Sequence, residues 1–123
     1  MNFLGCALFL LYITGCEKDT IRNSASDLPA TVSFSKNIAP ILNNNCISCH
    51  GASGSSAMTP PVLQGVNTYQ DLMASVDTIK PEESDLYQMV IGKGDNQMPP
   101  SSLLPANDAS MILKWIQQGA KNN

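Results

Sequence analysis

Histidine is almost absent from this chain, whose 123 residues include only His50. There is no spare imidazole to act as a base, and no plausible nucleophile–base pair stands out. Basic residues are few as well: the seven lysines and arginines are scattered, and the formal net charge is −3. The composition therefore argues against a nucleic-acid partner and against an enzyme.

Long apolar runs are missing too. The uncharged apolar run over residues 3–13 is too short to span a bilayer, but it has the length of a signal peptide's apolar part. It ends in Ile13-Thr14-Gly15-Cys16, which resembles a bacterial lipobox whose cysteine is lipidated. No lysine or arginine precedes the run, which departs from the usual pattern. We expect an exported lipoprotein anchored through Cys16, facing the periplasm or in the outer membrane; the alternative is an ordinary buried segment.

The cysteines fall into two groups, one in the N-terminal stretch and one in Cys46-Ile47-Ser48-Cys49-His50. The second group reads C-x-x-C-H, the attachment signature of a c-type haem. Thiols three positions apart can both reach the vinyl groups on one side of a porphyrin, and His50 is then free to bind the iron. A zinc site built from these three side chains would lack its fourth protein ligand. A disulfide or other metal pair is the remaining alternative.

A methionine is the usual second axial ligand in haem electron carriers, where it raises the reduction potential. Met98 stands in a loop, and Pro99 and Pro100 stiffen the backbone that presents its sulfur. Met58 is also in a loop, but it follows His50 closely and has little chain with which to reach the opposite ring face. The other candidates fall on helical apolar faces, where packing already explains them: Met73, Met89 and Met111. We therefore expect Met98 to be the second ligand.

Apolar spacing predicts an all-α domain with about four short helices. The first has Phe34, Ile38, Ile41 and Leu42 on one face, a Ser33 or Ser35 cap, and Pro40 in its first turn. The others are expected over residues 68–76, over 81–91 with Gly92 closing, and over 107–118 with Gly119 closing. The last helix carries a stripe of Ala109, Ile112, Leu113 and Ile116, with Met111 and Trp115 widening it.

The chain resembles class I c-type cytochromes, specifically small bacterial single-haem domains. The resemblance rests on residues 34–42, 46–51, 84–87, 98–100 and 115–120, in that order. The resemblance covers about residues 32–120, and with the N-terminal segment interpreted as a signal peptide (1–15) and a lipidated tether (16–30), it places the cytochrome c domain over residues 31–123. It also implies first and last helices that cross at the edge of one covalently attached haem c, held by Cys46 and Cys49. His50 and Met98 are the implied axial ligands.

Electron transfer is the implied activity, with transient redox partner proteins. The acidic net charge favours a basic docking patch on such a partner. Two other functions stay open at this point. One is a haem-based sensor or peroxidase-like protein whose sixth coordination site opens, and the other is a binding module without haem.

Overall fold

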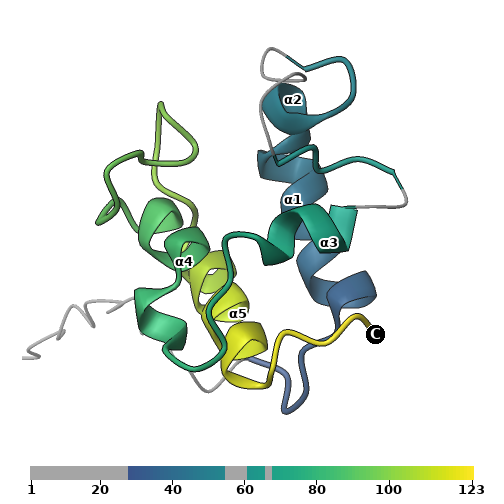
Figure 1. The fold of residues 1–123 in the computed structure, drawn as a ribbon, viewed down its shortest axis with the longest axis vertical. Helices are drawn as coiled ribbons and strands as arrows, with labels where there is room; N and C mark the ends of the chain where they lie inside the picture. The colour runs from purple at the N-terminus through teal and green to yellow at the C-terminus, as the bar shows by residue number, and fades with distance from the viewer. Residues whose placement is uncertain (1–27, 55–60, 66–67) are drawn as a thin grey trace, which may run out of the picture.

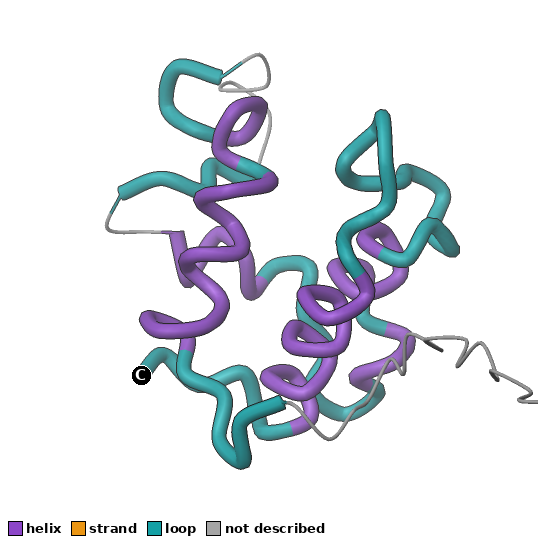
Figure 2. The backbone as a smooth tube through the Cα atoms, turned by 180° about the vertical axis from the view of Figure 1, so that it is seen from behind, coloured by secondary structure: helices purple, strands orange, loops and turns teal. Residues whose placement is uncertain are grey.

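The computed structural model describes residues 28–54, 61–65 and 68–123. Every regular element in these residues is helical, which confirms the predicted all-α class (Figure 2). The expected signal peptide, most of the tether, Cys16 and Met58 lie outside the described residues. None of the described helices is long and apolar enough to cross a bilayer.

The first helical segment forms as predicted, in two pieces. A π-helical turn over Phe34–Ile38 is followed by α1, Ala39–Asn45. The Ser33 side chain accepts a hydrogen bond from the Lys36 backbone N–H, and Pro40 lies in the first turn of α1. The four residues of the predicted apolar face are all buried: Phe34, Ile38, Ile41 and Leu42. The short helix α2, Ile47–His50, follows directly.

The second predicted helix is shorter than expected. Helix α3 spans Thr68–Met73, so the prediction overran its end by three residues. The Ser75 and Val76 amides donate to carbonyls three residues back, which tightens the chain into a turn. The Ser75 carbonyl is then free to accept from the Leu86 amide, 2.9 Å away, and this bond ties the turn to the next helix.

The third predicted helix is divided at Ser84. A 3₁₀ turn over Pro81–Glu83 precedes α4, Asp85–Val90. Ser84 adopts an extended ψ of 129°, and its buried hydroxyl accepts a hydrogen bond from the Asp77 amide. The Ser84 side chain thus provides an acceptor for a backbone N–H of the preceding loop, and the helix is interrupted at Ser84. Gly92 follows α4 with φ of +72°, as expected for a residue that closes a helix.

The last helix, α5, spans Ala106–Gln117 and is followed by Gly119 with φ of +87°. The predicted stripe is buried at Ala109, Ile112 and Ile116, and Trp115 extends it as expected. Trp115 is completely buried, whereas Leu113 is only half-buried. The centre of the Trp115 ring lies 5.7 Å from the centre of the Phe34 ring and 6.3 Å from that of the Tyr69 ring. The indole N–H of Trp115 donates a hydrogen bond to the Lys121 carbonyl.

These contacts place the first and last helical segments against each other, as the resemblance implied. In Figure 1, α1 and α2 form one arm of the molecule, and α4 with the loop after it forms the other. Helix α5 packs on α4 and on the π-helical turn, so it joins the bases of the two arms.

Candidate functional site

The motif Cys46–His50 lies at the junction of α1 and α2. Cys46 has a φ of −120°, which ends α1, and its carbonyl accepts hydrogen bonds from the amides of Cys49 and His50. Residues three apart in such a turn project to the same side, so the two thiols share one face. Neither cysteine forms a disulfide, and both are half-buried.

Burial raises the pKa of the Cys46 thiol to about 11, with a smaller contribution from the neighbouring Cys49. The free Cys46 thiol is therefore less readily ionised than an exposed one. In the part of the chain that the structure describes, no three His, Cys, Asp or Glu side chains gather to hold a metal ion. The geometry does not support a zinc site.

The imidazole of His50 is oriented by one backbone atom. Its Nδ1 lies 3.0 Å from the carbonyl oxygen of Pro61, and the His50 carbonyl accepts a hydrogen bond from the Leu63 amide at 2.7 Å. A carbonyl oxygen can only accept, so Nδ1 must carry the proton and Nε2 must have the free lone pair. His50 is thus held in the tautomer that an axial metal ligand needs.

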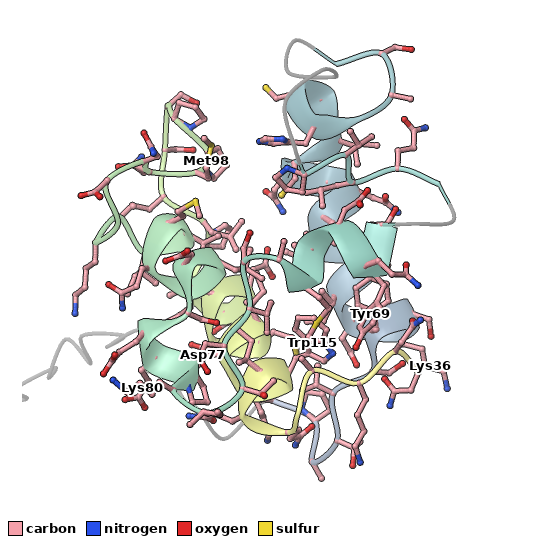
Figure 3. All side chains as sticks on the ribbon, in the orientation of Figure 1. Lys36, Tyr69, Asp77, Lys80, Met98 and Trp115 are labelled. Carbon is pink, nitrogen blue, oxygen red and sulfur yellow. The ribbon has the colours of Figure 1, made fainter. Side chains whose placement is uncertain are left out.

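Met98 is presented by the loop that follows α4. Its amide donates to the Met89 carbonyl at 3.1 Å, and the Leu104 amide donates to the Val90 carbonyl at 3.3 Å. Both bonds tie the loop to the last turn of α4. Figure 3 shows Met98 on this loop, on the arm opposite α1 and α2.

Two adjoining cavities lie between the arms. The first has a volume of about 420 Å³; α1 and α2 line it with Cys46, Cys49 and His50, and the loop lines it with residues 98–102. The second, of about 360 Å³, is mainly aliphatic and also reaches Cys46, His50 and Met98. Its apolar walls come from seven other positions: Leu42, Pro61, Leu63, Leu72, Leu86, Met89 and Val90. The structure therefore brings together all the described residues that the sequence assigned to the site.

One methionine has a different environment from the one expected. Met89 was expected to be explained by packing, but it lines the aliphatic cavity beside Met98. Met73 and Met111 do pack against the core as predicted. Met89 is thus the nearest rival of Met98 among the described methionines.

The family model for cytochrome c matches residues 35–120 of the chain. The chain belongs to the cytochrome c family. Comparisons with curated proteins and with solved structures find no match. Membership assigns covalently bound haem c as the cofactor and haem-based electron transfer as the activity typical of the family.

The residues present fit such a group. The cavities offer two free thiols on one face, a histidine with Nε2 free, and apolar walls that would cover a flat hydrophobic ring. Sequence reasoning missed Pro61 and the aliphatic walls. No local signal marks Pro61 as the partner of His50, because only the fold returns that carbonyl to the imidazole.

Proposed function

We propose that this cytochrome is a single-haem electron carrier with Cys46 and Cys49 as the covalent attachment points and His50 and Met98 as axial ligands. The main support for this proposal is that residues of the C-x-x-C-H motif and Met98 line the same two cavities, the motif on one side and Met98 on the other. The proton position on His50 supports the same assignment.

When bound, haem c supplies an iron that accepts and releases one electron. The chain's own residues set the conditions for that exchange. Pro61 holds the Nδ1 proton of His50, which makes Nε2 a stronger donor. The aliphatic wall residues would shield a bound haem from water, and the neutral thioether of Met98 would favour the reduced iron as a ligand.

The anchored loop favours an electron carrier over a sensor or a peroxidase-like protein. Those alternatives require Met98 to leave its position. The loop backbone is bonded at Met98 and again at Leu104, so a loop movement that carried the sulfur away would break hydrogen bonds with α4. Transient contacts with redox partner proteins suit such a carrier.

Intact-mass measurement of protein made with haem-attachment machinery tests the attachment sites. We expect the mass of the chain plus one haem, stable to acid–acetone extraction. Replacing both Cys46 and Cys49 by Ala should abolish the added mass, and Cys49→Ala alone should make the product unstable. A mass equal to the bare or disulfide-bonded chain in the unmodified protein contradicts the proposal.

Export and lipidation are part of the same proposal. The apolar run, the small residues before Cys16 and the polar segment after it support a mature protein that begins with lipidated Cys16. Labelled palmitate should enter the unmodified protein, and Cys16→Ala should lose the label and stay unprocessed or leave the membrane. Label that persists in Cys16→Ala would exclude this anchor.

A further inference from the structure

The charged residues of the chain avoid the segments that form the site. Residues 37–70 contain no Asp, Glu, Lys or Arg, and neither do residues 96–107. The first segment carries Cys46, Cys49 and His50, and the second carries Met98. Charge is thus missing from both sides of the cavity at the level of the sequence.

The structure joins these two segments into one surface around the mouth of the larger cavity. We call it the uncharged rim and define it as Asn44, Asn45, Ser48 and residues 99–102. Asn44, Ser48 and Ser101 are exposed to solvent, and so are their neighbours Pro100 and Ser102. No Asp, Glu, Lys or Arg side chain lines this cavity among the described residues.

The charges concentrate elsewhere. Figure 3 shows Asp77 and Lys80 at the end of the molecule remote from Met98, and Lys36 is also far from it. Lys80 is 2.8 Å from the Glu83 carboxylate. The nearest charges along the loop, Lys93 and Asp95, have opposite signs. Asp85 and Asp95 line a separate pocket with Met89 and Asn96. The rim itself therefore carries no charge, and the nearest carboxylates lie outside its cavity.

We propose that the uncharged rim is the face through which electrons leave and enter, and that the partner is a redox protein whose own contact face is uncharged. This rests on the proposed function and names its partner class. Charged side chains of a partner would lose their hydration on docking against the rim and would find no opposite charge there, which would make the free energy of association less favourable. Asn and Ser side chains can instead exchange hydrogen bonds with water for bonds across the contact.

The propionate charges of a bound haem would lie away from the rim. A porphyrin carries its propionate carboxylates on the edge opposite its vinyl groups, and Cys46 and Cys49 would hold the vinyl edge. The net charge of −3 consequently does not describe the docking face, and the basic partner patch expected from it is replaced. Association should proceed without electrostatic steering.

The absence of charge at the exit face can be tested by oxidising the reduced protein with two small reagents, one negatively and one positively charged. Ferricyanide and tris(phenanthroline)cobalt(III) would be compared by stopped flow from about 0.05 to about 0.5 M ionic strength, where distant charges are screened progressively. The overall net charge of −3 alone should change the two rates in opposite directions by about two- to threefold over this range. A roughly tenfold or larger fall with salt for the cobalt complex, together with a comparable rise for ferricyanide, would show a negative exit face and overturn the inference.

Two matched variants locate the exit. Ser101→Lys places a positive charge on the rim, and Thr78→Lys places one beside Asp77. At low salt Ser101→Lys should speed the ferricyanide reaction several-fold and slow the cobalt reaction, whereas Thr78→Lys should change neither. Ser102→Lys serves as a second rim variant. Equal effects of Ser101→Lys and Thr78→Lys, or no effect of either rim variant, would refute the assignment.

A readout without electron transfer comes from paramagnetic broadening of amide signals in the reduced protein. Redox-inert hexacyanochromate(III) and hexaamminechromium(III) should broaden the signals of Asn44, Ser48 and Ser101 weakly and equally. Preferential broadening by one of them would contradict the inference. Protein that lacks covalent haem would overturn the proposed function and this inference together, whereas haem protein with strongly salt-dependent rates overturns the inference alone.

Discussion

The proton of His50 is fixed by a single atom, the carbonyl oxygen of Pro61, 3.0 Å from Nδ1. That contact leaves Nε2 as the only free lone pair on the only imidazole of the chain. At the scale of the residue, the sequence predicts His50 and both motif cysteines as haem-binding residues, because their spacing is that of a haem-attachment signature. It could not identify Pro61, whose role depends on where the chain returns.

Met98 carries the second residue-scale claim. Met98→Ala should keep the covalent haem, lose the near-infrared band of methionine-to-iron ligation, and bind carbon monoxide readily. The potential should fall by on the order of 0.1 V, within the roughly 0.8 V range over which axial ligands tune haem. Near-infrared absorption and a redox titration measure these changes.

Met89→Leu is the matched control, because Met89 lines the aliphatic cavity beside Met98 and Leu has a similar volume. It should keep the near-infrared band and shift the potential little. If Met89→Leu loses the band and Met98→Ala keeps it, the axial ligand has been assigned to the wrong methionine.

At the scale of the element, the residue that follows α5 connects the end of this helix to the segment before the first helix. The side chain of Gln118 accepts from the Val32 amide at 2.9 Å and donates to the Ala30 carbonyl at 2.8 Å. It therefore fastens the segment before the first helix to the end of the last one. Buried Trp115 adds the aromatic contact with Phe34 nearby.

Gln118→Ala removes both hydrogen bonds and should lower the free energy of unfolding by about 1–3 kcal/mol. Gln117→Ala, at an exposed neighbouring position, should cost less than about 0.5 kcal/mol. Denaturant titration of the haem-containing protein, followed by far-ultraviolet circular dichroism, compares the two. Equal losses would mean that Gln118 contributes only helix propensity.

Helix positions were predictable because periodic apolar residues and the end signals Ser33, Pro40, Gly92 and Gly119 act locally. The errors have tertiary causes. The break at Ser84 is set by its bond to the Asp77 backbone, and α3 ends early where Ser75 is tied to Leu86. Leu113 is only half-buried, whereas Trp115 is completely buried and packs against the rings of Phe34 and Tyr69.

At the scale of the whole molecule, the two arms together form the site, which neither arm could form alone. The motif and Met98 lie far apart in sequence, and the fold brings both to the same cavities. The sequence motif predicts the attachment chemistry. The aliphatic walls could not be predicted, because they form only when several helices pack together. The net charge is an average over the chain and does not describe the rim, which has no Asp, Glu, Lys or Arg among its lining residues.

The central claim is that this cytochrome holds its haem closed on both faces and works by passing electrons. The most direct test is to add carbon monoxide to the reduced, unmodified protein at neutral pH and record the visible spectrum. With His50 and Met98 both bound, the spectrum should stay that of the reduced protein. Rapid, stoichiometric formation of the carbon monoxide complex would contradict the account and favour a sensor or peroxidase-like protein.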